Sequence, residues 1–257
     1  MTLVTSEAIL LRSHDYSESS RIFRFLTPDL GIVSLLGRGV RRKGGKGMAP
    51  IQSFSEGSIT FRYKADRDLQ TLRESHIGDG SLALGRGVRR FLGAALVAEL
   101  LLTHSMREGD RALYDWVREV MRHLADDDED RVLGWTLSGG WRTLAHLGFP
   151  PRLSGCALCD RKLEGPADTD AKWLCRFDES EGGLICSDCA VGRDRPRIGP
   201  QAWRDLTRLV DGDPPDGLRG KQAHLSLLER FATRHLEPSK GFRSFNALRT
   251  VLNKTVA

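Results

Sequence analysis

The sequence predicts an α+β chain of several domains, in which a small five-stranded β-barrel precedes an α-helical domain that carries an inserted four-cysteine zinc element. Three observations predict this architecture. Short strand-like apolar segments fill the first part of the chain, apolar residues recur at helical spacing from about Leu84, and two Cys-x-x-Cys pairs interrupt the helical part. The expected boundaries are 1–80 for the barrel, 81–151 and 198–257 for the two parts of the helical domain, and 152–197 for the insert.

The first domain is expected to contain five short strands joined by tight turns, at 8–12, 21–26, 31–36, 58–63 and 69–74. The second strand alternates charged and apolar residues, so one face is buried and the other carries Arg21 and Arg24. Five strands in so short a segment favour a small barrel, and an OB-fold is the commonest barrel of this kind. An SH3-like barrel is the alternative.

A glycine-rich basic loop joins the third and fourth expected strands, and its cations are Arg38, Arg41, Arg42, Lys43 and Lys46. Glycine keeps such a segment out of regular structure and lets cations approach a surface closely. This composition predicts phosphate contact in place of base readout, with a solvated loop kept basic for solubility as the alternative. A P-loop is excluded because Gly47 stands where Ser or Thr is required and because strands flank the loop on both sides.

Other cations are expected to extend this phosphate-binding surface. Four of them belong to the barrel strands: Arg21, Arg24, Arg62 and Lys64. Arg86, Arg89 and Arg90 begin the first predicted helix, where positive charge opposes the helix dipole, so they either extend the phosphate-binding surface or pair with nearby acids. Tyr63 is the best candidate for stacking on a base, and electrostatics are expected to outweigh stacking.

The helical domain is expected to contain six amphipathic helices, at about 84–102, 110–125, 131–147, 200–210, 218–236 and 242–251. Pro200 can open the fourth helix, and Pro150 disfavours helix in the residue before it. The acidic run 126–130 is expected to be a solvated connection that favours the start of the next helix. Helices after the insert are expected to pack on those before it.

The insert carries the ligands of a predicted structural zinc site: Cys156, Cys159, Cys186 and Cys189. Four thiolates complete a tetrahedral site and leave no position for a catalytic water. The turn 181–183 lets the spacer close as a hairpin. Two disulfides or reactive thiols are the alternatives, and the absence of a secretory signal disfavours disulfides. Cys175 is expected to be a small buried apolar residue.

The composition bounds the class of protein. The chain has 257 residues, a net charge of +5, and no apolar run near the roughly 18 residues that span a bilayer. A cytoplasmic location is expected. The sequence contains no His-Glu-x-x-His or His-x-Glu pattern, which disfavours a zinc hydrolase. Two alternatives to a phosphate-binding function are a metal-dependent nuclease that uses the acids at 126–129 and a zinc-stabilised protein-interaction module.

The order of basic-looped barrel, helices, paired Cys-x-x-Cys motifs and helices resembles the bacterial DNA repair protein RecO family. The resemblance covers nearly the whole chain and is carried by 7–12, 15–22, 26–31, 37–42, 54–57, 156–159 and 182–186. No single stretch is diagnostic, but their order and spacing together are specific.

This resemblance implies an N-terminal OB-fold, a helical domain and a zinc-binding element in a recombination mediator that is not an enzyme. Members of the family bind single- and double-stranded DNA and anneal complementary strands. With RecR they help to load the recombinase RecA onto DNA coated by single-strand-binding protein (SSB). The resemblance therefore implies DNA, RecR and SSB as partners, a functional link to RecA, and a nucleoid-associated location. The tail 240–246 follows the family's ending only loosely.

Overall fold

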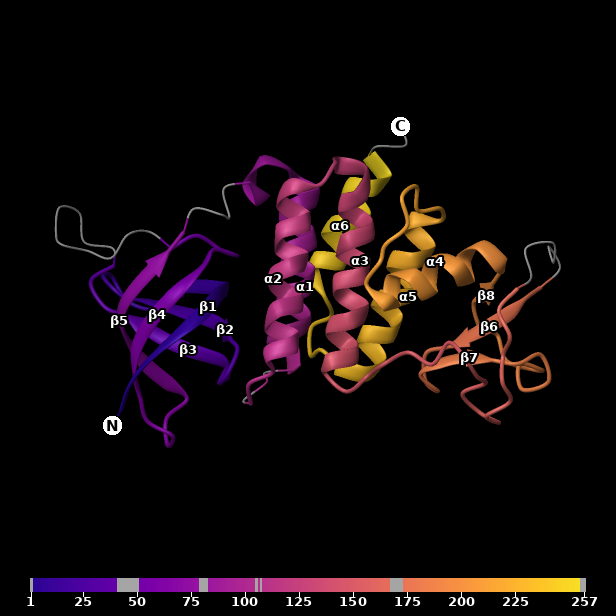
Figure 1. Ribbon diagram of the computed structural model, residues 1–257, viewed down its shortest axis with the longest axis horizontal. Helices are drawn as coiled ribbons and strands as arrows, with labels where there is room; N and C mark the ends of the chain where they lie inside the picture. The colour runs from indigo at the N-terminus through magenta and orange to yellow at the C-terminus, as the bar shows by residue number, and fades with distance from the viewer. Residues whose placement is uncertain are drawn as a thin grey trace. The chain divides into compact units, whose positions relative to one another are not determined.

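The computed structural model describes residues 2–40, 51–78, 83–104, 106, 108–166 and 173–254 (Figure 1). The chain forms two units, Met1–Asp126 and Asp127–Ala257. The first contains strands β1–β5, the short 3-10 helix η2 and helices α1 and α2, and the second contains helices α3–α6 and strands β6–β8. Among the described residues, no helix combines the length and apolar character needed to cross a membrane.

The first five strands close into an OB-like barrel, as predicted. They are β1 (Thr2–Asp15), β2 (Arg21–Thr27), β3 (Gly31–Gly37), β4 (Glu56–Tyr63) and β5 (Leu69–Ile77). The order around the barrel is β1-β2-β3-β5-β4, and β3 pairs with β5 in parallel while the other neighbours are antiparallel. Because β1 pairs with β4 through its first half and with β2 through its second half, one long strand closes the ring.

Alternation along the strands builds the barrel core. Phe23 and Phe25 of β2 and Val33 and Leu35 of β3 belong to one buried cluster, so the residue between each pair points outward. Gly31 begins β3 with a φ of 61°, and a Cβ there would lie 2.5 Å from the carbonyl oxygen of Glu108. Glycine is therefore required where the chain that precedes α2 approaches the β2–β3 turn.

Helices α1 (Val88–His104) and α2 (Arg111–Asp126) contact each other within the first unit, and η2 (Leu84–Arg86) precedes them. Asp110 accepts a hydrogen bond from the backbone N–H of Leu113 (3.0 Å), which satisfies one of the free donors at the start of α2. The two helices also contact β1 and β2. The outward side chains Ile9 and Leu26 are consequently buried, although they lie outside the barrel core.

The second unit is built on α3 (Glu129–His146), which contacts both α4 (Pro200–Asp211) and α5 (Lys221–Leu236); α5 in turn contacts α6 (Arg243–Lys254). Trp141 of α3 is fully buried and lies 5.0 Å from the Phe231 ring of α5, measured between centroids. The Ser138 hydroxyl donates to the carbonyl oxygen of Leu209 (2.8 Å), which joins α3 to α4. Helices that follow the insert thus pack on α3, the last helix before it.

The insert contains a small antiparallel sheet in the order β7-β6-β8, formed by Gly183–Ile185, Cys175–Asp178 and Arg197–Ile198. Gly182 has a φ of 80° and lies in the β6–β7 turn, where the sequence predicted a turn at 181–183. Glu179 accepts a hydrogen bond from Arg230 of α5 (2.6 Å), and its carbonyl oxygen lies 3.0 Å from a His235 ring nitrogen. These contacts attach the insert to the helices of the same unit.

Candidate nucleic-acid interface and metal centre

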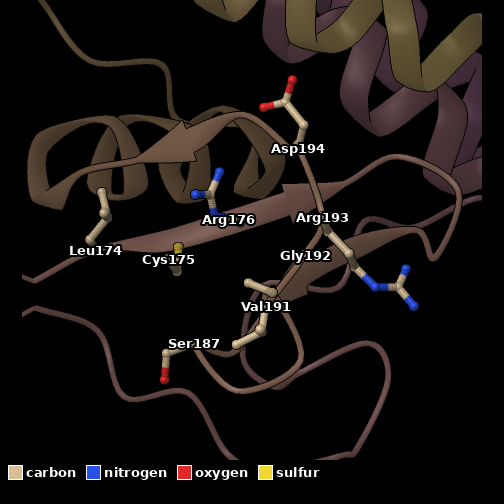
Figure 2. A pocket seen from close by; sticks show the side chains of 9 residues that line it. Leu174, Cys175, Arg176, Ser187, Val191, Gly192, Arg193 and Asp194 are labelled. Carbon is tan, nitrogen blue, oxygen red and sulfur yellow. The ribbon is translucent and has the colours of Figure 1, made fainter.

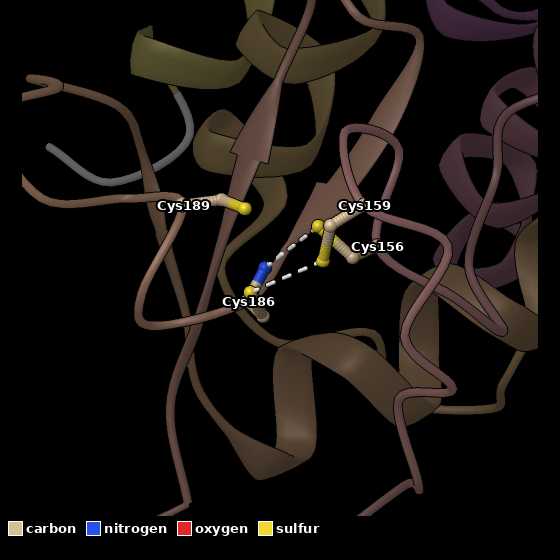
Figure 3. A group of neighbouring side chains, drawn as sticks. All are labelled: Cys156, Cys159, Cys186 and Cys189. Carbon is tan, nitrogen blue, oxygen red and sulfur yellow. Dashed lines mark hydrogen bonds between the residues drawn. The ribbon is translucent and has the colours of Figure 1, made fainter.

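The four cysteines predicted as metal ligands come together in the second unit. The sulfur atoms of Cys156, Cys159, Cys186 and Cys189 all lie within 4.8 Å of one another (Figure 3). The backbone N–H of Ala157 donates to the carbonyl oxygen of Leu184 (2.7 Å), so the first Cys-x-x-Cys turn is attached to β7, which leads directly into the second. The predicted grouping is confirmed.

The thiols at this centre have a chemistry suited to a cation. Burial alone raises the pKa of Cys156, but backbone N–H groups, including that of Cys186 at 3.3 Å, lower it to about 6. Hydrogen bonds with the sulfur atoms of Cys186 and Cys159 raise the pKa of Cys189 to about 12. A thiolate at Cys156 therefore disfavours a second thiolate at Cys189, and a bound cation would stabilise both. The residues fit a metal ion.

Cys175 lies outside this group, in β6, and is buried as predicted. Burial raises the pKa of its thiol to about 12, and its sulfur lies 3.8 Å from the carbonyl oxygen of Ile198. A surface cavity of about 550 Å³ lies beside it, where Leu174 and Val191 are exposed (Figure 2). Cys175 therefore belongs to the wall of the small sheet and not to the metal centre.

Within the acidic run at 126–130, Asp127 has structural partners and the other four acids are exposed, as expected for a solvated connection. Asp127 accepts hydrogen bonds from the Trp135 indole (2.7 Å) and pairs with Arg131 (3.2 Å). Within the part of the chain that the structure describes, the four cysteines are the one group of three or more His, Cys, Asp or Glu side chains close enough to hold a metal ion. The geometry therefore gives no support to a nuclease centre at these acids.

The outward face of the barrel brings two arginines together. Arg24 lies between the core residues Phe23 and Phe25 and so points outward, and it pairs directly with Arg12 of β1. Burial and the positive charge of Arg12 both lower the pKa of Arg24. Like charges on directly opposed strand positions destabilise a sheet, and a bound anion would relieve the repulsion between them.

One end of the barrel collects further predicted contact residues. Arg21 pairs in register with Asp15 and with Gly37, and its side chain forms an ion pair with Asp15 (2.8 Å). Arg38 follows Gly37 directly and is exposed. The other cations of the basic loop lie outside the described residues: Arg41, Arg42, Lys43 and Lys46.

Arg62 lies near the C-terminal end of β4, and Lys64 directly follows the strand. Arg62 is exposed and follows Phe61 of the barrel core, so it points outward. Both backbone groups of Lys64 bond to the side chain of Gln70, at 2.9 and 2.7 Å, which fixes the turn between β4 and β5. The register joins Arg62 to Thr71 of β5, so it occupies a different part of the barrel wall from Arg24.

The three arginines at the start of α1 have different surroundings. Arg86 is exposed at the end of η2, and Arg89 is half-buried. Arg90 donates to the carbonyl oxygens of Leu124 and Ala125, at 2.8 and 3.1 Å, in the last turn of α2. The positive charge of Arg90 opposes the dipole of α1 but complements the dipole of α2. Its guanidinium also supplies hydrogen-bond donors to the terminal carbonyl groups of α2.

Two family models match this chain: "Recombination protein O N terminal" over residues 1–80 and "Recombination protein O C terminal" over residues 87–243. The DNA repair protein RecO of Anaeromyxobacter sp. (strain K) is 30% identical over 255 residues, which cover 92% of this chain and 94% of the relative. The chain belongs to the RecO family. RecO of Rubrobacter xylanophilus is 31% identical over 74% of this chain and 72% of its own length, and RecO of Desulfatibacillum aliphaticivorans is 29% identical over 97% and 98%.

The RecO matches place both sites in a DNA repair and recombination protein. The N-terminal match covers all five barrel strands, and the C-terminal match covers α1–α5 and the four cysteines. The resemblance inferred from the sequence is confirmed. Arg12 was not predicted as a contact residue, because its position opposite Arg24 depends on strand register, which follows a β-bulge between Leu10 and Arg12.

Proposed function

We propose that this RecO-family chain is a recombination mediator that binds single- and double-stranded DNA, anneals complementary strands and is not an enzyme. Its relatives are named DNA repair proteins, which supports a role on DNA. The observation that carries the DNA-binding part is the Arg12–Arg24 pair on the outward wall of an OB-like barrel, a fold that commonly binds oligonucleotides.

The proposed binding is mainly electrostatic. Arg12, Arg24 and the cations of the basic loop would displace counterions from phosphates, which gives affinity that depends on salt and tolerates any sequence. Two strands neutralised on one cationic surface repel each other less, so annealing requires no nucleotide hydrolysis. Arg21 and Arg38 would extend this surface, and the remaining predicted cations would add contacts elsewhere on the protein, whereas Arg90 serves mainly as a cap on α2.

We further propose that zinc occupies the four-cysteine centre. Soft thiolate ligands in a set of four select zinc among common cellular cations, and a closed site of this kind supplies structural stability in place of catalysis. The low pKa of Cys156 supports this proposal, because the thiolate form is the one that binds a metal ion. The centre would hold the two Cys-x-x-Cys turns and the sheet beside them.

The proposed cellular role includes protein partners. With RecR, the chain would help to load RecA onto DNA coated by SSB, in a cytoplasmic, nucleoid-associated setting. The support for these partners is membership of the RecO family.

The test is a salt series of binding to a fluorescent single-stranded oligonucleotide. Three variants are compared with the wild type: Arg12→Ala, the triple change Arg41→Glu/Arg42→Glu/Lys43→Glu, and Lys221→Ala as a control at an exposed position of α5. Wild-type affinity is expected to fall steeply with salt. Arg12→Ala should reduce the salt slope by the amount expected for the loss of about one phosphate contact, and the triple variant should reduce the slope further. Equal slopes in all four proteins would refute the proposed surface.

A further inference from the structure

The connection between β1 and β2 is a tight hydrogen-bonded turn. The backbone N–H groups of Tyr16 and Ser17 both donate to the carbonyl oxygen of Ser20, at 3.0 and 3.3 Å. The Asp15–Arg21 ion pair closes the base of the turn. The backbone that carries Tyr16 is therefore held in a defined place and loses little conformational freedom when a ligand binds.

Tyr16 exposes its ring on this turn, with 62% of the residue accessible to solvent. Other aromatic rings of the barrel pack within it: Phe23, Phe25 and Phe61 are buried, and Tyr63 packs edge-on against Phe61 at 6.5 Å between centroids. Among the described barrel residues, Tyr16 is the aromatic residue with more than half of its surface exposed. An exposed ring offers a planar apolar face to a ligand.

The turn lies next to cationic positions of the barrel. Arg21 begins β2 beside Gly37, so the end of β3 and the exposed Arg38 lie at the same end of the barrel as Tyr16. Arg12 precedes Tyr16 by four positions, a span of about 13 Å along an extended strand. One short strand of nucleic acid could therefore contact phosphate-binding cations and the Tyr16 ring together.

We infer that Tyr16 is a stacking site for one unpaired base of single-stranded DNA. This inference rests on the proposed DNA binding and adds a base-contacting element to it. Every nucleobase has a π-face, so stacking tolerates any sequence. Bases inside a duplex are already stacked on their neighbours, whereas backbone phosphates are exposed in both forms. Tyr16 would thus give the barrel a preference for single strands that cations alone do not supply.

The experiment compares wild type, Tyr16→Leu and Tyr16→Phe on three probes of equal length: oligothymidylate, the same backbone with abasic sites, and a blunt duplex. Tyr16→Leu is expected to weaken oligothymidylate binding about tenfold, because it removes one stacking partner. Binding to the abasic strand and to the duplex should not change, and Tyr16→Phe should match the wild type. The salt slope should stay the same, since no phosphate contact is lost.

Each other outcome overturns the inference in an identifiable way. If the wild type binds oligothymidylate and Tyr16→Leu binds it equally well, stacking at Tyr16 is refuted while the proposed function stands. If Tyr16→Leu weakens all three probes alike, Tyr16 acts through the shape of the turn and not through a base. If the wild type binds none of the probes, the proposed function fails and the stacking site fails with it. Equal melting temperatures of the three proteins confirm that folding is unaffected.

Discussion

Asp178 shows at the scale of one residue how a charge is kept inside the insert. It is fully buried and accepts hydrogen bonds from Arg195 (2.8 Å), Arg193 (3.2 Å) and Ser180 (2.5 Å). Burial alone would raise the pKa of Asp178, but the bonds from Arg195 and Ser180 lower it to about 2. An ionised carboxylate with this many donors stabilises the β6–β7 turn.

This low pKa predicts the pH dependence of stability. The folded pKa of Asp178 is below the unfolded value near 4, so its contribution is present above pH 4 and is lost as the pH falls towards 2. Asp178→Asn is expected to cost about 2 kcal/mol in the free energy of unfolding at pH 7, and the difference from the wild type should shrink in acid. Urea unfolding at several pH values measures this difference.

Asp213→Asn is the matched control for that measurement. Asp213 pairs with Arg208 in the same unit (2.8 Å), but 72% of its side chain is exposed. Exposed ion pairs contribute little, so this variant should change stability by less than about 0.5 kcal/mol. A pH-independent loss in Asp178→Asn would show that packing, and not charge, stabilises the turn.

Arg90 shows how one residue serves an element other than its own. Its place in the first turn of α1 is unfavourable by sequence rules, yet its guanidinium lies on the last carbonyls of α2. Sequence spacing cannot reveal this arrangement, because Arg90 and Leu124 are 34 positions apart in the sequence. The packing of α1 on α2 determines the role.

Arg90→Met is therefore expected to destabilise the protein by about 1 kcal/mol, since it removes two hydrogen bonds and a favourable charge while it keeps an apolar stem. Thermal or urea unfolding checks this value. Arg86→Met, at an exposed position of η2, serves as the control and should have little effect. Equal losses in both variants would contradict a specific cap.

Element boundaries were predicted to within about four residues, except at the start of the first strand. The helix expected at 200–210 is Pro200–Asp211, because proline and glycine mark its two ends. The first strand was expected at 8–12 but extends over Thr2–Asp15. The first half of this strand has a polar, exposed side. It forms a strand because β4 pairs with residues Thr2 to Ile9. That partner lies far away in the sequence.

At the scale of the whole molecule, the metal centre is expected to stabilise the second unit without taking part in phosphate binding. A chelator should lower the melting temperature of the wild type, and Cys186→Ser should lower it and abolish the further effect of the chelator. Salt-dependent binding of an oligonucleotide should persist in both cases, because the Arg12–Arg24 surface belongs to the barrel.

Cys175→Ala is the control for this test, since Cys175 is buried but lies outside the cluster. It should lower the melting temperature by loss of packing and still respond to chelator. A wild-type protein whose melting temperature is the same with and without chelator would contradict a structural metal.

The sequence alone predicted the barrel, the helices, the grouping of four cysteines and the RecO resemblance. The barrel and the helices follow from local periodicity and from turn residues, which act over a few neighbouring positions. The cysteine grouping and the resemblance follow from the order and spacing of motifs along the chain. Only the tertiary structure decided that Arg12 faces Arg24, that Arg90 caps α2, and that Tyr16 is exposed while Tyr63 packs on Phe61. The physical reason is that register and burial depend on which distant segments become neighbours, and the local pattern does not specify those neighbours.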